Sequence, residues 1–187
     1  MTNIKNRIIA FLIALIVIVG STVFSVHRFL GGACQEVTDS FYNGVYNSDW
    51  NTTRPSLNKQ LNNRYDAANG LYAILAGYPD LSNYTEALRI AKNTLKDATG
   101  IHEKYLANQQ LEDAFAAALH ALQSQPLDGR DQEMLKNYSE NFSAARDVIA
   151  QCGYNESVRE FYRSTLNVFP ANLLRHIIPQ RLPVLFE

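Results

Sequence analysis

The stretch PSLNKQLNNRYDAANGLYAILAGYP, residues 55–79, gives the clearest indication of fold class in this chain. Apolar side chains recur along it at spacings of 4, 4, 3, 4 and 3, the period of one helical face in a bundle. Pro55 suits the first turn of a helix, and Gly77-Tyr78-Pro79 ends it. The sequence predicts a helix whose apolar face consists of Leu57, Leu61, Tyr65, Ala68, Tyr72 and Leu75.

Further helical stripes follow along the chain. One covers residues 88–98 and stops near Gly100, and the next covers residues 111–122. Asn83 and Glu86 have the spacing of a capping box at the start of the first of these. Gly100 therefore either separates two helices or is absorbed into one.

The last helical pattern runs from residue 131 to about residue 168. Its spacings predict one long final helix with an irregularity near Gly153, where the phase jumps. No stretch alternates with period 2, so no strands are expected. The predicted fold is all-α, an antiparallel up-and-down bundle of four helices, or of three if Gly100 does not break the chain.

Residues 8–26, IIAFLIALIVIVGSTVFSV, form an apolar run of 19 residues without a charge. At 1.5 Å per residue the run spans about 28 Å, close to the roughly 30 Å hydrocarbon core of a bilayer. A cleavable signal peptide has a shorter apolar region, so we expect an uncleaved single-pass anchor. Lipidation of Cys34 is the alternative.

The charges that flank this run predict its orientation. Lys5 and Arg7 precede it, whereas Arg28 and a mostly neutral His27 follow it, which places the N-terminus in the cytoplasm. Beyond residue 28 the chain holds 14 basic and 18 acidic residues, a net charge of −4. We expect the helical domain to lie outside the cytoplasm.

Small residues and a change of periodicity divide the chain. After Gly31-Gly32 the spacing of Cys34, Val37, Phe41 and Val45 predicts a short juxtamembrane helix. The predicted regions are a cytoplasmic N-terminus (1–7), the anchor (8–26), a juxtamembrane helix and linker (27–54), the bundle (55–170) and an apolar C-terminal tail (171–187).

The residues that carry chemistry do not form a recognisable catalytic or metal site. His102-Glu103 begins a helical zinc motif, but Leu106 occupies the position of the second histidine. Glycine-rich phosphate loops and nucleophile elbows are missing from the sequence. The net charge of −1 excludes an electrostatic surface for nucleic acid. We therefore expect no enzyme activity, no cofactor, no metal and no nucleic-acid partner.

The two cysteines, Cys34 and Cys152, face an oxidising space in the predicted orientation, so a disulfide is allowed there. A bridge needs Cα atoms within about 7 Å. Cys34 lies close to the predicted anchor, whereas Cys152 lies about 17 residues, roughly 25 Å, from the end of the last helix. Buried free thiols are the favoured prediction.

An ordered set of short motifs resembles the LemA family. The set comprises LNNRYD at residues 61–66, GY at 77–78, ARD at 145–147, YNESV at 154–158, FPANLL at 169–174 and FE at 186–187. Two departures mark a divergent member. Residues 67–71 lack the proline of the family pattern, and the distance from Ala145-Arg146 to Tyr154-Asn155 is about one helical turn longer.

The resemblance implies a membrane-anchored helical bundle without accepted catalytic residues. The positions that match the family motifs, for which we expect structural roles, are Arg64, Asp66, Gly77, Tyr78, Arg146, Tyr154, Asn155, Pro170 and Asn172. The predicted function is an interaction or scaffold module of the bacterial cell envelope. It would contact the bilayer through residues 8–26, and either a membrane or envelope protein or a second copy of itself. The alternative is an envelope enzyme or accessory with a polar site that joins Arg64, Asp66 and Arg146.

The segment 169–187 is apolar but contains three prolines, so it cannot form one regular helix. Such a segment must either pack across the end of the bundle or lie in the lipid interface with Arg175 and Arg181 at the headgroups. We expect Phe169 and Leu173 to contact the base of the bundle and the last residues to be less ordered.

Overall fold

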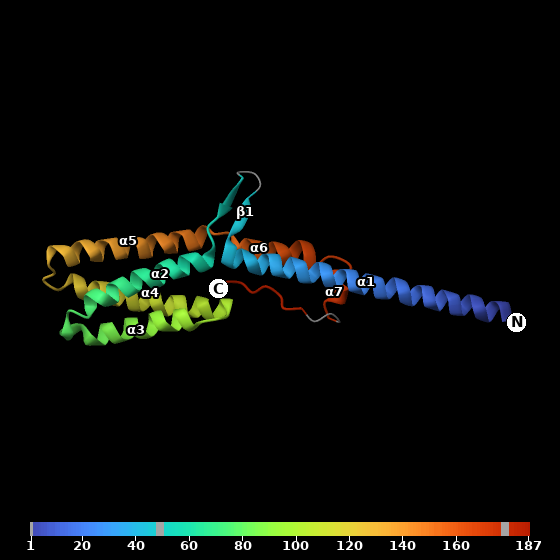
Figure 1. The fold of residues 1–187 in the computed structure, drawn as a ribbon, viewed down its shortest axis with the longest axis horizontal. Coiled ribbons are helices and arrows are strands. Elements are labelled where there is room, and N and C mark those ends of the chain that lie inside the picture. Colours follow the sequence, from blue (N-terminus) through green and yellow to red (C-terminus); the bar gives the residue numbers. More distant parts are fainter. Residues whose placement is uncertain (1, 48–50, 177–179) are drawn as a thin grey trace. The chain divides into compact units, whose positions relative to one another are not determined.

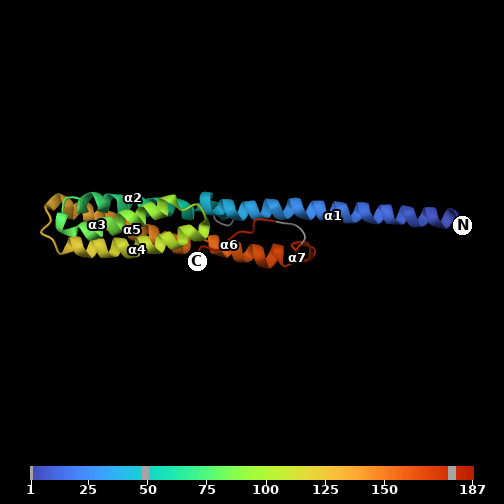
Figure 2. The same cartoon turned by 90° about the horizontal axis from the view of Figure 1, so that it is seen from below.

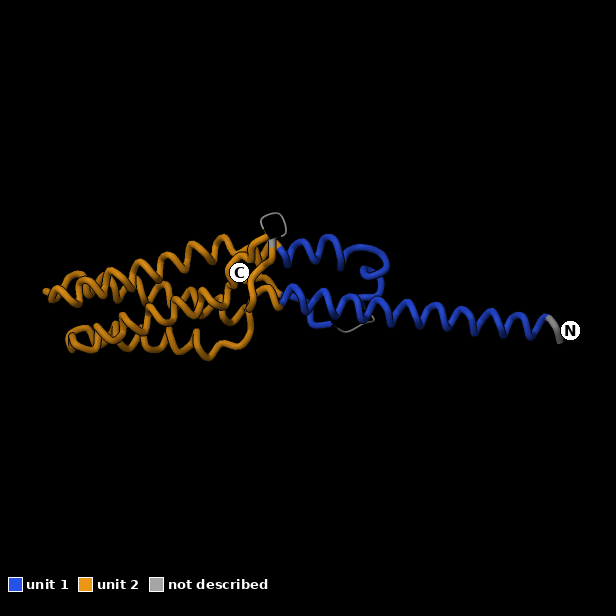
Figure 3. The backbone as a smooth tube through the Cα atoms, turned by 45° about the horizontal axis from the view of Figure 1, so that its top comes forward, with its two compact units in different colours: residues 1–38, 157–183 blue, residues 39–156, 184–187 orange. Residues whose placement is uncertain are grey.

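The computed structural model describes residues 2–47, 51–176 and 180–187. Two compact units divide the chain (Figure 3). Unit 1 comprises residues 1–38 and 157–183, and unit 2 comprises residues 39–156 and 184–187.

Unit 2 is built on a bundle of four helices (Figures 1 and 2), which confirms the all-α prediction. These helices are α2 (Leu57–Leu75), α3 (Ser82–Asp97), α4 (Ile101–Gln123) and α5 (Gly129–Gln151). Gly100 separates α3 from α4, as the four-helix prediction requires. The carboxylate of Glu103 accepts hydrogen bonds from the backbone N–H groups of Gly100, at 3.0 Å, and Thr99, at 3.2 Å, and thereby caps α4.

Helix α2 is the central element of this bundle, because it contacts α3, α4 and α5. The hydroxyl of Ser56 caps its start by accepting a hydrogen bond from the backbone N–H of Lys59 at 3.1 Å. The apolar face of α2 is rotated slightly from the predicted one, since Arg64 and Leu71 are buried whereas Tyr65 and Tyr72 are half-buried.

The predicted capping box at Asn83 and Glu86 is wrong. A short 3-10 turn, η1 (Pro79–Leu81), leads directly into α3, and Leu81 occupies the N-cap position. Glu86 pairs with Arg89 along the same helix instead. Pro79 favours this tight turn because its φ angle is fixed.

Helix α1 (Thr2–Asn43) joins the predicted anchor and juxtamembrane helix into one element. The pair Gly31-Gly32 does not break it, since glycine in a helix interior costs only about 1 kcal/mol and tertiary packing offsets that cost.

The expectation of no strands is also wrong. β1 (Val45–Asn47) and β2 (Thr52–Arg54) pair antiparallel, with Val45 opposite Arg54. Three-residue strands are too short to show an alternating pattern.

The single long helix predicted beyond residue 131 is wrong as well. Helix α5 ends at Gln151, Gly153 adopts a φ of +81°, and the chain restarts as α6 (Tyr154–Glu160) and the π-helical turn η2 (Phe161–Leu166). A left-handed glycine after a helix is a common stop signal. The phase jump in the sequence therefore marks a true break.

Replacing Gly153 with alanine should lower the free energy of unfolding by about 1–2 kcal/mol. Alanine at this position would have to adopt the left-handed backbone conformation of Gly153, which disfavours residues with a side chain. Its Cβ would lie 2.8 Å from Nη1 of Arg54. Urea unfolding of the full chain in detergent micelles, followed by circular dichroism, measures the change. Gly129→Ala is the matched control, because a Cβ there meets no atom within 4 Å and should change stability by less than about 0.5 kcal/mol. Equal effects of the two substitutions would contradict this account.

Unit 1 has its own small apolar core. Leu30 and Cys34 of α1 pack with Phe161 and Leu166 of η2 and with Ala171 of the short helix α7 (Ala171–Leu174). Residues 157–170, which the sequence assigns to the bundle, belong to this unit. The break at Gly153 separates them from α5, and their large apolar side chains complete the core around Leu30.

The expectation for the apolar tail is wrong in both parts. Phe169 and Leu173 are exposed rather than packed against the bundle base. The last residues, by contrast, dock on unit 2, where the Phe186 side chain is buried among aromatic rings. Phe186 packs against the rings of Phe41 and Tyr105, with centroids 6.0 and 5.3 Å away.

Candidate functional site

An ion-pair network around one buried arginine lies between α2, α4 and α5. Arg64 on α2 has a fully buried side chain, whose guanidinium donates hydrogen bonds to Asn108 Oδ1, at 2.6 Å, and to the Glu112 carboxylate. Arg146 on α5 forms an ion pair with the same carboxylate, and its Nη1 is 3.7 Å from Glu112 Oε1. Two of the motif positions named by the resemblance, Arg64 and Arg146, thus share one acidic partner.

The Arg64 guanidinium also stacks on an aromatic pair. Its Cζ lies 4.0 Å from the centroid of the Phe142 ring, which in turn stacks on Phe115. Burial lowers the pKa of Arg64, and the negative charge of Glu112 opposes that effect. Because the ordinary pKa of an arginine side chain is far above neutral pH, Arg64 keeps its charge at neutral pH in spite of its burial. The network therefore holds a fixed buried cation rather than a group that exchanges protons.

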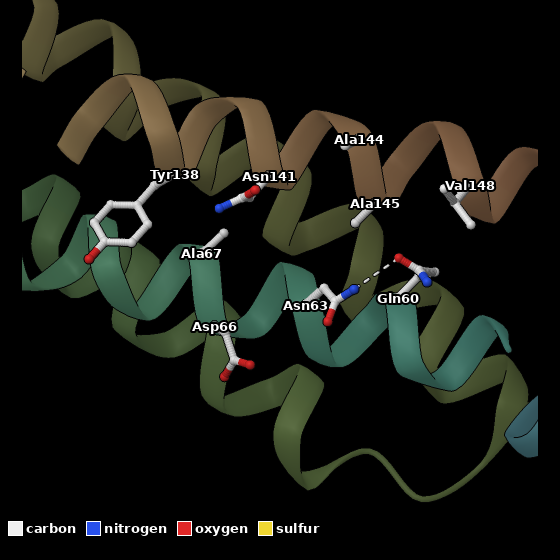
Figure 4. A pocket seen from close by; sticks show the side chains of 9 residues that line it. All are labelled: Gln60, Asn63, Asp66, Ala67, Tyr138, Asn141, Ala144, Ala145 and Val148. Carbon is white, nitrogen blue, oxygen red and sulfur yellow. Dashed lines mark hydrogen bonds between the residues drawn. The ribbon is translucent and has the colours of Figure 1, made fainter. Parts of the chain in front are cut away.

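A groove of about 440 Å³ lies between α2 and α5 (Figure 4). Asp66 lines it together with neutral polar side chains, and Asn63 donates a hydrogen bond to Gln60 across one turn of α2 at 3.0 Å. Its full lining is Gln60, Asn63, Asp66, Ala67, Tyr138, Asn141, Ala144, Ala145 and Val148. Arg64 and Arg146 are not among these residues, so the groove does not join the three charged positions of the alternative prediction.

Gly77 and Tyr78 close the end of α2. The backbone N–H of Gly77 donates to the carbonyl of Ile74 at 3.0 Å. The Tyr78 hydroxyl donates to Asp131 Oδ2 at 3.0 Å and so ties this turn to the start of α5. Partial desolvation, followed by this hydrogen bond, raises the pKa of Tyr78. The pair fixes the connection between two bundle helices.

Tyr154 and Asn155 hold the segment 184–187 in unit 2. The Tyr154 hydroxyl donates to the carbonyl of Val184 at 2.7 Å. The Asn155 side chain makes two hydrogen bonds with the backbone of Phe186, donating to its carbonyl at 3.1 Å and accepting from its N–H at 2.8 Å. We call this arrangement the Asn155 clasp. It brings together two motifs, YN and FE, whose nearest residues, Asn155 and Phe186, lie 31 residues apart in the sequence.

The remaining motif positions, Pro170 and Asn172, lie in unit 1 at the start of α7, where Pro170 is half-buried and Asn172 is exposed.

The incomplete zinc motif at His102-Glu103 gains no further ligands from the residues that the structure describes. His102 contacts the backbone carbonyl of Glu187 at 3.0 Å through Nδ1. Its neighbour Glu103 has a lowered pKa because it accepts the backbone hydrogen bond from Gly100. Within residues 2–47, 51–176 and 180–187, no three His, Cys, Asp or Glu side chains are placed to share a metal ion.

Three residues of the polar contacts were not predicted from the sequence: Asn108, Glu112 and Lys92, of which Lys92 is also buried. The Lys92 ammonium donates to Asn69 Oδ1 at 3.0 Å and lies 4.9 Å from the centroid of the Tyr72 ring. A usable signal was present, because Arg64, Lys92 and Asn108 each occupy a position three or four residues from a leucine of the apolar stripe. Polar residues in the phase of an apolar stripe mark buried, partnered groups.

Cys34 and Cys152 are both buried free thiols, as favoured from the sequence. Burial raises the pKa of Cys152, so less of it is thiolate at pH 8 than for an exposed cysteine. We expect Ellman's reagent to modify the folded chain in detergent at least about tenfold more slowly than the urea-unfolded chain. In the unfolded chain, two cysteine thiols per molecule should react with the reagent without prior reduction. A single fast-reacting thiol in the folded protein, or none after unfolding, would contradict this prediction.

Comparisons with models of known families, with curated protein sequences and with solved structures find no match to this chain.

Proposed function

We propose that this chain is a single-pass membrane protein of the LemA type whose helical bundle serves as an interaction or scaffold module at the bacterial cell envelope, without catalysis of its own. Its N-terminus would lie in the cytoplasm and its bundle outside, as the basic residues before the apolar run favour.

One observation carries the proposal. Helix α1 is long and apolar enough to cross a membrane, and none of its most apolar 18-residue window is buried by the rest of the protein. Side chains such as Phe11, Ile16 and Val17 are largely exposed. So large an uncovered apolar surface is stable in lipid and unstable in water.

The bundle supports a structural rather than a chemical role. Its buried charges, Nη1 and Nη2 of Arg64 and the ammonium of Lys92, donate hydrogen bonds to partners on neighbouring helices. The motif positions Tyr78, Arg146 and Asn155 likewise make contacts that join one element to another. These contacts hold the elements of the bundle together, and in this proposal the outer surface of the bundle is where another protein docks.

Orientation is tested by fusing alkaline phosphatase after Glu187 through a flexible linker, which spares the buried Phe186. The enzyme folds only where disulfides form, so activity is expected. The matched control is a chain in which Lys5 and Arg7 are replaced by Gln and two lysines follow residue 28. Its phosphatase activity should fall. An inactive fusion of the unaltered chain, with a fluorescent cytoplasmic reporter at the same place, would reverse the orientation.

The scaffold role is tested by affinity capture of the full chain from membranes in mild detergent, with the tag before Thr2. We expect a reproducible envelope partner or self-association. A second chain, in which an unrelated apolar helix replaces residues 8–26, should retain the same partner because the bundle supplies the contact. Failure to recover any partner, together with a monomeric mass in detergent, would refute the scaffold role.

A further inference from the structure

The segment that begins in η2 and continues through α7 packs on α1 just beyond its apolar run. Ala171 and Leu166 share the unit 1 core with Leu30, which lies four residues past Val26, the last residue of the run. At 1.5 Å per residue this places Leu30 about 6 Å beyond the end of the run. Figure 3 shows the segment, in the colour of unit 1, turning back beside α1.

A second contact lies even closer to the apolar run. The Gln180 side-chain amide is 2.8 Å from Nδ1 of His27 and donates to the His27 carbonyl at 3.3 Å. His27 is the residue directly after Val26. The headgroup layer on each side of a bilayer is roughly 5–8 Å thick, so both contacts fall within it if residues 8–26 span the hydrocarbon core.

The outer side of this segment is apolar and uncovered. Phe169 is 76% exposed, Leu173 is 62% exposed and Val168 is 50% exposed. Three large apolar side chains exposed within six consecutive residues mark a contact surface rather than ordinary solvent exposure. We call Val168, Phe169 and Leu173 the α7 apolar surface.

The charges around this surface match a lipid headgroup layer. Residues 167–183 contain Arg175 and Arg181 and no acidic residue, and Arg28 follows the apolar run of α1. Arg175 is exposed, with its Nη1 held by Asn167 Oδ1 at 2.9 Å. Arginines beside exposed aromatic and aliphatic side chains are typical of segments that lie in the interface of an anionic membrane.

We propose that the α7 apolar surface inserts into the headgroup layer of the membrane that α1 spans, with Arg28 and Arg175 on anionic lipid phosphates. This inference rests on the proposed anchor, since it takes the position of the bilayer from residues 8–26. The segment would then act as a second, peripheral contact that fixes the rotation of unit 1 about the axis of α1.

The test uses tryptophan depth in vesicles of phosphatidylcholine and phosphatidylglycerol that carry brominated acyl chains. The single native tryptophan is removed by Trp50→Phe in the full chain. One tryptophan is then returned by Phe169→Trp, and in separate chains by Leu173→Trp, Ile16→Trp or Glu36→Trp. Circular dichroism checks that each chain remains helical, and all four positions are exposed, so the substitutions leave both cores intact.

The expected result is a graded pattern of quenching. Tryptophan at 169 and at 173 should lose about half of its fluorescence to bromines near the headgroup end of the acyl chain, and less to deep bromines. Ile16→Trp should be quenched most by deep bromines. Glu36→Trp, ten residues or about 15 Å past Val26, should be unaffected.

Three other outcomes overturn the proposal in distinguishable ways. If Ile16→Trp is quenched while 169 and 173 are not, the anchor stands and the interfacial contact is wrong. A blue-shifted emission at 169 that depends on protein concentration but not on brominated lipid would assign the surface to a second copy of the chain. If Ile16→Trp is not quenched, the anchor itself fails, and this inference fails with it.

Discussion

Replacing Glu112 with alanine should lower the free energy of unfolding of the bundle by about 3 kcal/mol. The substitution leaves Arg64 charged, 1% exposed and with Asn108 as its main remaining partner. Because arginine does not discharge at neutral pH, the protein cannot escape this cost by releasing a proton. Urea unfolding of the full chain in detergent micelles, monitored at the helix band, measures the loss.

Arg64→Met is the matched control for this prediction. It removes the buried charge and leaves Glu112, which is 37% exposed and still has Arg146 at 3.7 Å. Methionine fills much of the space over Phe142, so we expect a loss of only about 1 kcal/mol. A larger loss for Arg64→Met than for Glu112→Ala would show that the contacts of the guanidinium, and not its uncompensated charge, control stability.

Phe186→Ala should destabilise unit 2 by about 3 kcal/mol, the low end of the range for buried phenylalanine. The ring is 7% exposed and lies 5.3 Å from Tyr105 and 6.0 Å from Phe41, measured between ring centroids. Its loss leaves a cavity beside both rings and weakens the Asn155 clasp. Thermal unfolding of the full chain in detergent measures the effect.

Two further substitutions separate packing from hydrogen bonding at this place. Asn155→Ala keeps the Phe186 ring but removes two backbone hydrogen bonds, so we expect a loss of about 1–2 kcal/mol. Val184→Ala alters a half-exposed side chain and should cost less than about 0.5 kcal/mol. If Phe186→Ala and Val184→Ala had the same effect, the docking of residues 184–187 would not contribute to stability.

Local periodicity predicted the helices of the bundle, because a helix of 16 to 23 residues repeats its pattern several times. The predicted phase of α2 is slightly wrong. Tyr65 fits the apolar stripe in the sequence, but its neighbour Arg64 is the residue that is buried. A buried arginine is explained only by Asn108 and Glu112, more than 40 residues away. No local pattern can reveal such a partner.

The failures in the tail have a similar cause. Phe169 and Phe186 are equally hydrophobic, yet only Phe186 is buried. Which of the two is buried depends on the aromatic rings and amide groups that surround it in the folded chain. Phe186 meets Asn155, which satisfies its backbone, whereas Phe169 projects from a turn too short to cover it. In the polar network, the motif resemblance pointed to Arg64 and Arg146, but it did not indicate that Glu112 would join them.

The central position of α2 also has a consequence for how the protein opens. Since α2 contacts α3, α4 and α5, the backbone N–H groups of its buried residues, such as Leu61 and Leu71, reach solvent mainly when these interfaces separate. Amide hydrogen exchange in α2 should therefore be the slowest in unit 2 and should report its full unfolding free energy. Helix α3, packed on α2 and α4, can fray at its Ser82 end while the rest of the bundle stays closed, so its first turns should exchange much sooner.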